Sequence, residues 1–242
     1  MNSLKQKFLI IKLSSIGDIV HALPFLRTLR ANRPNAYIAW IIEESFQDLV
    51  KGNPDLDEVI PVRTRYWRKN INIQSWNEIH QIKKLLKKRQ FDWTFDLQGL
   101  IKTGFIASMT SAPNRAGFHR SNCREKINAW FNNQRSKYIS TDSHIVDRCL
   151  SQLSILGDFH PQIEFPLPIG EKDEIISKAF MVKNSKLTEK PIAGINPGAG
   201  FPTKLWSIER YARLADKLTE ELGFSILLTW EPGEEEMVRN IA

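Results

Sequence analysis

Asp18 is the first residue whose type and position could do chemistry. It follows Gly17 in a short polar loop, between a mostly apolar run at residues 8–13 and apolar residues at helical spacing. A strand, a tight loop and a helix in this order put the loop at the carboxyl end of a parallel strand, where open sheets bind ligands. Asp18 has two interpretations: an N-cap that accepts hydrogen bonds from free backbone N–H groups, or a carboxylate that faces a substrate cleft as a general base.

A basic segment at residues 63–69 follows the predicted strand at 59–62. It contains four cations and two aromatic residues, and is read as a loop. The guanidinium groups of Arg65 and Arg68 match phosphate and carboxylate groups bidentately, which favours a cradle for such anions. The alternative is a solvated loop whose long side chains lie along the surface.

A second glycine-containing loop, residues 196–200, lies between a predicted strand and a predicted helix. Gly198 and Gly200 allow backbone N–H groups to face an anion, and with Lys204 nearby they indicate a diphosphate site. A purely structural loop is the alternative. The pattern is neither GxGxxG nor GxxxxGK[ST], which argues against a dinucleotide dehydrogenase or a P-loop enzyme. Farther along, Glu234 can accept hydrogen bonds from a ribose.

The sequence gives no sign of a metal or a cofactor. The pair Asp55 and Asp57 resembles the cation-binding DxD of one class of sugar transferases, but it follows Asn-Pro and leads into a strand, so a solvated turn is predicted. Cys123 and Cys149 lie in neither a CxxC pattern nor a His-rich cluster. We therefore expect a reducing compartment, no metal and no cofactor.

The charge balance favours anionic partners. The 242 residues carry 34 Lys and Arg against 27 Asp and Glu, a net charge of +7. No recognition helix, zinc spacing or RNA-binding strand motif is present, so no nucleic-acid partner is expected. The apolar run at residues 8–13 is too short for a signal peptide or a membrane span, and a cytoplasmic protein is expected.

Alternating strand and helix patterns predict an α/β fold with parallel strands. The pattern pauses in a proline-rich and charged region and then restarts, which predicts a first domain at 1–165, a linker region at 166–190 and a second domain at 191–242. The last segment is short for a doubly wound domain, so the second domain is expected to be truncated.

Two helices carry specific expectations. Pro24 predicts that the helix after Asp18 kinks or begins in two pieces. Residues 74–89 are predicted to form a helix with Trp76 and other apolar residues on one face. Its lysines are expected on an exposed face that can also touch an anionic membrane. Asp96 and Gln98 are expected at the same sheet edge as Asp18.

Several motifs along nearly the whole chain match one family. They are KLSSIGDIVHALP at 12–24, WRK at 67–69, FDLQGLIK at 95–102, RAGF at 115–118 with Arg124-Glu125, and KLW at 204–206 with Glu234. Together they resemble the ADP-heptose:lipopolysaccharide heptosyltransferases, most closely the heptosyltransferase I group. This resemblance implies a GT-B architecture of two Rossmann-like domains, the first holding the acceptor and the second the nucleotide sugar.

The resemblance also implies an activity: inverting, metal-independent transfer of L-glycero-D-manno-heptose from ADP-heptose to Kdo of the lipopolysaccharide inner core. Asp18 would be the general base. In the donor half, Lys204 would neutralise the departing ADP, Glu234 would hold the ribose, and Gly198 would belong to the donor loop. The residues implied to bind the Kdo carboxylates and lipid A phosphates are Arg65, Arg68, Lys69 and Arg124.

The resemblance further implies a peripheral protein on the cytoplasmic face of the inner membrane. Family members continue into an Asp-Thr/Ser-Gly…His segment that binds the donor, and this sequence does not contain it. The sequence is therefore compatible with two functions. One is a glycosyltransferase, and the alternative is a truncated, non-catalytic binder of anionic lipopolysaccharide core.

Overall fold

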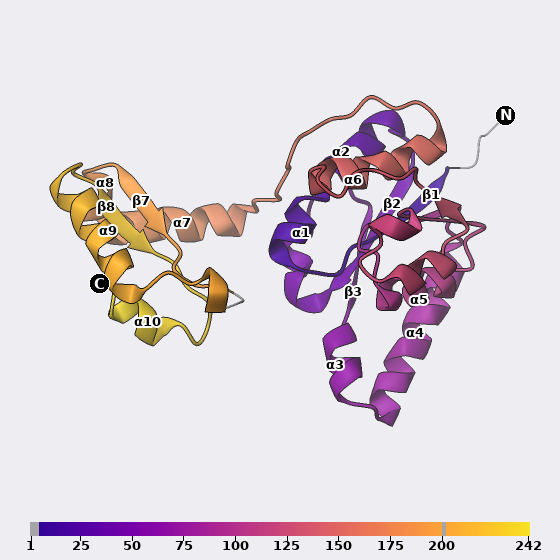
Figure 1. The fold of residues 1–242 in the computed structure, drawn as a ribbon, viewed down its shortest axis with the longest axis horizontal. Helices are drawn as coiled ribbons and strands as arrows, with labels where there is room; N and C mark the ends of the chain where they lie inside the picture. Colours follow the sequence, from indigo (N-terminus) through magenta and orange to yellow (C-terminus); the bar gives the residue numbers. More distant parts are fainter. Residues whose placement is uncertain (1–4, 200–201) are drawn as a thin grey trace. The chain divides into compact units, whose positions relative to one another are not determined.

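The computed structural model describes residues 5–199 and 202–242. The chain divides into two compact units, Met1–Pro168 and Ile169–Ala242, called unit 1 and unit 2 here. Figure 1 shows the helices and strands of both units.

Unit 1 is built on a parallel sheet. In its described part the sheet has six strands in the order β3-β2-β1-β4-β5-β6. The strands are β1 (Lys7–Ile11), β2 (Tyr37–Glu43), β3 (Glu58–Val62), β4 (Trp93–Asp96), β5 (Asn114–Gly117) and β6 (Gln134–Arg135). This is the order of doubly wound nucleotide-binding folds, and the direction of winding reverses between β1 and β4. The predicted α/β fold is confirmed.

Helices connect these strands. The α-helices of unit 1 are α1 (Ile16–Val20), α2 (Leu23–Asn32), α3 (Thr64–Lys69), α4 (Ile73–Arg89), α5 (Ile101–Met109) and α6 (Ile145–Leu150). The 3₁₀ helices are η1 (Glu44–Leu49), η2 (Arg120–Asn122), η3 (Lys126–Trp130) and η4 (Ser151–Leu156). Pro24 lies in the first turn of α2, where a missing N–H costs nothing, so the helix does begin in two pieces. The segment predicted as a basic loop is instead the short helix α3.

Strand β1 is buried on both faces of the sheet and contributes to both parts of the core. Phe8 and Ile10 belong to a buried cluster that includes residues of α2 and α6. Leu9 and Ile11 point to the other face and belong to a cluster with residues of α4 and α5. A strand buried on both faces is fixed in register, and the loop that follows it is therefore fixed in position.

The acidic pair Asp55 and Asp57 lies at the predicted turn, but only Asp57 is exposed there, so the prediction of a solvated turn is wrong for Asp55. Asp55 is only 4% exposed and accepts a hydrogen bond from Arg27 at 3.1 Å. Asp57 accepts from Arg30 at 2.6 Å and from the backbone N–H of Ile38 at 2.8 Å. Both carboxylates bind cations of α2, so they fasten that helix to the edge of the sheet.

Unit 2 repeats the strand–helix–strand pattern. Its strands β7 (Ile192–Ile195) and β8 (Ser225–Leu228) pair in parallel. Its helices are α7 (Glu171–Lys183), α8 (Ser185–Thr188), η5 (Pro202–Lys204), α9 (Ile208–Glu220) and α10 (Glu235–Arg239). The predicted order of a strand, a loop, a helix and a second strand is confirmed. In the described residues of the whole chain, none of the helices has the length and apolar character needed to span a bilayer.

Asp96 organises the loop after β4. Its buried carboxylate accepts hydrogen bonds from Gln98 N at 2.9 Å, Gly99 N at 3.0 Å, Thr103 Oγ1 at 2.8 Å and Asn128 Nδ2 at 2.5 Å. Burial raises the pKa of Asp96, and these hydrogen bonds act against that rise. The residue at this sheet edge therefore serves the fold.

Asp96→Asn is expected to lower the free energy of unfolding by about 2–4 kcal/mol, because an amide cannot accept at both of its heavy atoms and leaves buried donors unpaired. Urea denaturation followed by circular dichroism measures the effect. The exposed Asp158→Asn is the control and should change stability by less than about 0.5 kcal/mol. Equal stability of the two variants would show that Asp96 does not hold the loop.

Candidate functional site

A cavity of about 400 Å³ opens in unit 1. It is lined by Ser14, Thr64, Arg65, Trp67, Arg68, Ile79, Lys102, Phe105, Ile106 and Met109. Ser14 follows β1 and Lys102 follows β4, the two strands between which the winding of the sheet reverses. The cavity therefore lies where doubly wound sheets bind their ligands.

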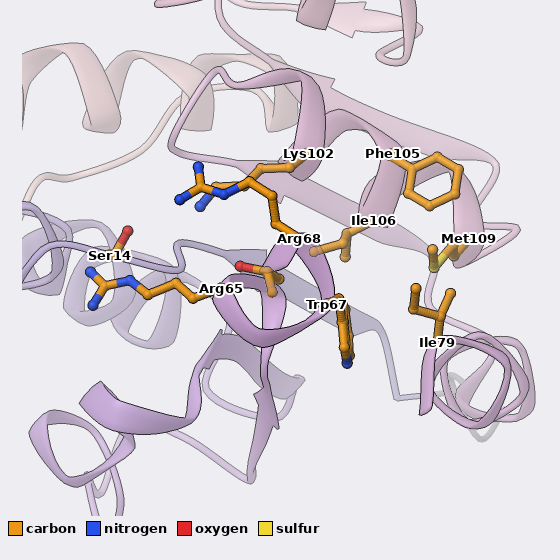
Figure 2. Close-up of a pocket in the computed structure, with 10 residues that line it drawn as sticks. Ser14, Arg65, Trp67, Arg68, Ile79, Lys102, Phe105, Ile106 and Met109 are labelled. Atoms are coloured by element: carbon orange, nitrogen blue, oxygen red, sulfur yellow. The ribbon is translucent and has the colours of Figure 1, made fainter. Parts of the chain in front are cut away.

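The cavity has a basic side and an apolar side. Figure 2 shows the cationic ends of Arg65, Arg68 and Lys102 on the side of Ser14. The apolar side chains lie on the opposite side of the view: Trp67, Ile79, Phe105, Ile106 and Met109. Such a lining suits a ligand that carries anionic groups next to an apolar part.

Buried Glu43, at the end of β2, positions the start of α3. It accepts hydrogen bonds from Thr64 Oγ1 at 2.5 Å and from the backbone N–H of Arg65 at 3.0 Å. The Arg65 guanidinium also lies over the ring of Phe46, with its carbon 5.1 Å from the ring centroid. Arg65 is thus oriented by its own fold before any ligand binds.

Arg63 fulfils a different role from the other arginines of this segment. It pairs with Glu78 of α4, which also accepts from Trp67 Nε1 at 2.7 Å. The hydrogen bond from Arg63 lowers the pKa of Glu78. Arg63 therefore ties α3 to α4, while Arg65 and Arg68 line the cavity.

Lys102 is a cavity residue that the sequence did not single out as a site residue. Burial lowers the pKa of this half-buried lysine; the charges of Arg65 and Arg68 act in the same direction, and Glu43 opposes them. The available signal was its position in the motif at residues 95–102, at the second residue of a helix that follows a strand end. Three cations converge here, which favours binding of an anion.

Asp18 is the third residue of α1 and not its N-cap, but it does accept a hydrogen bond from a backbone N–H at the start of the helix, in a capping box with Ser15. The N-cap of α1 is Ser15, and Asp18 lies one turn later. Its Oδ2 accepts hydrogen bonds from the Ser15 backbone N at 3.2 Å and Oγ at 3.3 Å, while Oδ1 lies 4.0 Å from Nζ of Lys12. The side chain is 32% exposed. Asp18 does not line the cavity itself; it lies in α1, directly after the loop that supplies Ser14.

Gln98 joins the β1 loop to the β4 loop, at the sheet edge where it was expected. Its Oε1 accepts from the backbone N–H of Leu13 at 2.8 Å and its Nε2 donates to the carbonyl of Ser14 at 3.1 Å. Lys12 adds a hydrogen bond to the Leu97 carbonyl at 2.9 Å. The loop that leads into α1, and so to Asp18, is therefore held by hydrogen bonds to the β4 loop.

The other two predicted acceptor residues lie outside the cavity lining. Lys69 ends α3 and is exposed. Arg124 is exposed and follows the stretch that packs against Gly99, whose backbone has φ of +69°. Any role of Lys69 and Arg124 in binding stays a prediction.

In unit 2, two of the three predicted donor residues meet. Gly198 lies so close to Glu234 that a Cβ at this glycine would collide with the Glu234 carboxylate. Glu234 is the N-cap of α10, and its Oε2 accepts from the backbone N–H of Glu231 at 2.9 Å. Lys204 is exposed at the end of η5. Gly200, also part of the predicted loop, lies outside the described residues.

No group of three or more His, Cys, Asp or Glu side chains that could hold a metal ion occurs among residues 5–199 and 202–242.

Known proteins are similar to this chain in sequence and in fold. Residues 79–242 match glycosyltransferase family 9 (heptosyltransferase). Lipopolysaccharide heptosyltransferase 1 of Pseudomonas aeruginosa is 29% identical over 234 residues, covering 93% of this chain. The chain spans 61% of that relative's length.

Solved structures are similar to this chain as well. The Escherichia coli heptosyltransferase WaaC with ADP-2-deoxy-2-fluoro heptose has a TM-score of 0.76 at 26% identity, covering 98% of this chain and 73% of that one. A family 9 glycosyl transferase from Veillonella parvula has a TM-score of 0.82 at 23% identity, covering 98% and 65%. These neighbours have the GT-B fold class that the sequence predicts.

Proposed function

Since the chain belongs to glycosyltransferase family 9 (heptosyltransferase), we propose that it transfers L-glycero-D-manno-heptose from ADP-heptose to Kdo of the lipopolysaccharide inner core. The observation that carries this proposal is the cavity of unit 1, where three cations face an apolar wall. A sugar acid linked to a lipid offers carboxylates next to an apolar part. The similarity to a heptosyltransferase solved with an ADP-heptose analogue supports the donor.

In the proposed reaction Asp18 is the general base. Its carboxylate takes the proton from the acceptor hydroxyl while the oxygen attacks the anomeric carbon of the heptose. The bond from that carbon to the diphosphate oxygen breaks, the configuration inverts, and ADP leaves with the bonding electrons. Oδ1, which lies near Lys12 and is not hydrogen-bonded to Ser15, is the oxygen we assign to the proton.

The acceptor's anionic groups would bind Arg65, Arg68 and Lys102, and its lipid part would contact the apolar wall. Exposed Lys69 and Arg124 would extend the basic surface toward lipid A phosphates. Because the acceptor is a lipid, we propose that the reaction takes place at the cytoplasmic face of the inner membrane, with the protein bound peripherally.

In the donor half, Lys204 would neutralise the diphosphate of the departing ADP. Glu234 would accept hydrogen bonds from the ribose, and the close approach of Gly198 would set the position of its carboxylate. No metal takes part in the proposed reaction.

The lowered pKa of Lys102 predicts an alkaline limit on acceptor use. As the pH rises, Lys102 loses its proton earlier than an ordinary lysine, the cavity loses a cation, and kcat/KM for the acceptor falls. Lys102→Arg keeps its charge at all accessible pH values, so its decline should start at higher pH. The pH profile of kcat/KM measures this, because it reports groups of the free enzyme. Superimposable alkaline limbs would rule out Lys102 as the titrating group.

Gly198→Ala is expected to weaken ADP binding about tenfold, because the new methyl group displaces the Glu234 carboxylate, one charged hydrogen-bond acceptor. Stability should change little, since the displaced group is the end of a flexible side chain. Calorimetry with ADP measures the affinity, and Gly194→Ala, with open space around its Cβ position, is the matched control. Unchanged ADP affinity in Gly198→Ala would show that the contact between Gly198 and Glu234 plays no part in donor binding.

A transfer assay tests the proposed function. The 242-residue chain is incubated with ADP-heptose and Kdo-lipid A, with and without EDTA, and the product is detected by mass spectrometry. The expected result is a product heavier by one heptose, equal amounts of ADP, and the same rate in EDTA. If the chain binds the acceptor but neither binds ADP nor transfers heptose, the non-catalytic binder is supported instead. A loss of the transfer rate in EDTA would contradict metal independence.

A further inference from the structure

The turn between α3 and α4 and the first turn of α4 together expose three large apolar side chains. Ile71 is 82% exposed, Ile73 75% and Trp76 62%. Trp76 was expected on one face of α4 with other apolar residues, and it does line a cavity together with Ile79, although its own side chain is exposed. The two helices form a hairpin that extends away from the sheet, with this turn at its far end (Figure 1). We call these three residues the apolar tip.

Polar contacts hold the turn that carries the apolar tip. Asn72 caps α4 by accepting from Ser75 N at 2.9 Å, and the Ser75 hydroxyl donates to the carbonyl of Asn70. Tyr66 Oη donates to Gln74 Oε1 at 3.1 Å and so links the two helices. The apolar side chains therefore project together from a structured turn, and a contiguous exposed apolar patch of this kind marks a site of interaction with another surface.

The apolar tip is continuous with the candidate site. A second cavity of about 480 Å³ is lined by Trp76, Asn77, Ile79, His80, Lys83, Phe105, Ser108 and Met109. Ile79, Phe105 and Met109 also line the first cavity. One apolar surface thus runs from the tip, between α4 and α5, to the basic cavity.

The face of α4 that lines the second cavity is apolar near the tip and basic farther along the helix. Trp76 and Lys83 both line the second cavity, and seven residues of helix separate them by about 10 Å along the axis. Lys84, Lys87 and Lys88, farther from the tip, are exposed as well. An apolar end followed by lysines about 10 Å away matches the depth profile of a bilayer surface, where acyl chains lie below anionic phosphates.

We propose that the apolar tip is the surface by which this chain docks on an anionic phospholipid bilayer. Ile71 and Ile73 enter the acyl region, Trp76 lies at the interface, and Lys83 contacts headgroup phosphates. Docked in this way, the surface between α4 and α5 leads from the bilayer to the basic cavity. The inference deepens the proposed function and rests on it for the lipid acceptor, but docking itself needs neither donor nor acceptor.

Sedimentation with phospholipid vesicles tests the proposal. With vesicles of phosphatidylcholine containing about 30% phosphatidylglycerol, Ile71→Ser/Ile73→Ser should lower the partition coefficient at least about tenfold. Ile163→Ser, at a site 61% exposed elsewhere in unit 1, is the matched control and should bind like the unaltered chain. Vesicles of phosphatidylcholine alone should bind the unaltered chain about tenfold more weakly, since the lysines lose their partners.

Fluorescence quenching places the tip in the bilayer. Lipids brominated in the acyl chain should quench the unaltered chain, and Trp76→Phe should remove most of that quenching. Trp130→Phe, which removes another exposed tryptophan, should leave it in place. Equal quenching in Trp76→Phe and Trp130→Phe would overturn the proposal. Vesicle binding by Ile71→Ser/Ile73→Ser as strong as that of the unaltered chain would also overturn it.

Two other occupants of the tip give different results, and either would overturn the proposal. A second copy of the chain would appear as a dimer in light scattering that Ile71→Ser/Ile73→Ser dissociates without any effect on vesicle binding. A single acyl chain would bind as a free fatty acid, with no binding to vesicles. Loss of transfer to a soluble Kdo acceptor with vesicle binding intact would contradict the proposed function alone, whereas the reverse result would contradict only the docking surface.

Discussion

Asp18→Asn is expected to lower kcat for heptose transfer by about 10³-fold, within the range that a lost general base produces. The amide cannot take the proton of the acceptor hydroxyl, yet its oxygen can still accept the hydrogen bond from Ser15, so the start of α1 should remain folded. ADP affinity should not change, because the proposed donor residues Gly198 and Glu234 belong to unit 2. Steady-state rates and calorimetry with ADP measure the two effects.

Asp147→Asn provides the matched control for this experiment. Asp147 occupies the third position of α6 as Asp18 does in α1, and both helices are short elements of unit 1. The control should retain full activity, and circular dichroism should show that both variants are folded. Full activity of Asp18→Asn would remove Asp18 from the mechanism, and equal losses in both variants would point to a structural effect.

Arg65→Ala/Arg68→Ala is expected to lower kcat/KM for the acceptor by about 10²-fold or more. Each charge-assisted hydrogen bond contributes about 1.5–3 kcal/mol, and two guanidinium groups of the cavity are removed together. The loss should appear mainly in KM, because these side chains hold the acceptor before and during the reaction. Initial rates over a range of acceptor concentrations at fixed donor concentration separate KM from kcat.

Two further variants show whether that loss comes from the charge and the planar shape of the cavity arginines. Arg65→Lys/Arg68→Lys keeps both charges without the planar fork, and should recover part of the loss. Arg213→Ala removes an exposed arginine of α9 in unit 2 and should leave the acceptor KM unchanged. An unchanged KM in the double alanine variant would show that the acceptor binds outside the cavity.

The local features of the fold could be predicted from the sequence because they depend on neighbours in the chain. The apolar run that became β1 is buried on both faces, as a central parallel strand requires, and Pro24 marked the break between α1 and α2. The loop that leads to Asp18 in α1 could be predicted from the same pattern, since a parallel strand ends at that edge of the sheet.

The features that were missed depend on residues far apart in the sequence. Arg27 pairs with Asp55 across 28 positions, and Asp55 is buried although the turn around it is partly exposed. The start of α3 is held by Glu43, 21 positions before Thr64, so local propensity alone indicated a loop. Lys102 could not be assigned to the site from the sequence, because its place there depends on the strand order, which puts the loops after β1 and β4 next to each other.

A crystal structure of this chain with a bound Kdo-containing acceptor tests the central claim most directly. We predict electron density for the Kdo carboxylate between Arg65, Arg68 and Lys102. One sugar hydroxyl should lie about 3 Å from Oδ1 of Asp18, within reach for proton transfer. Density for the sugar away from these three cations, or with every hydroxyl out of reach of Asp18, would contradict the account.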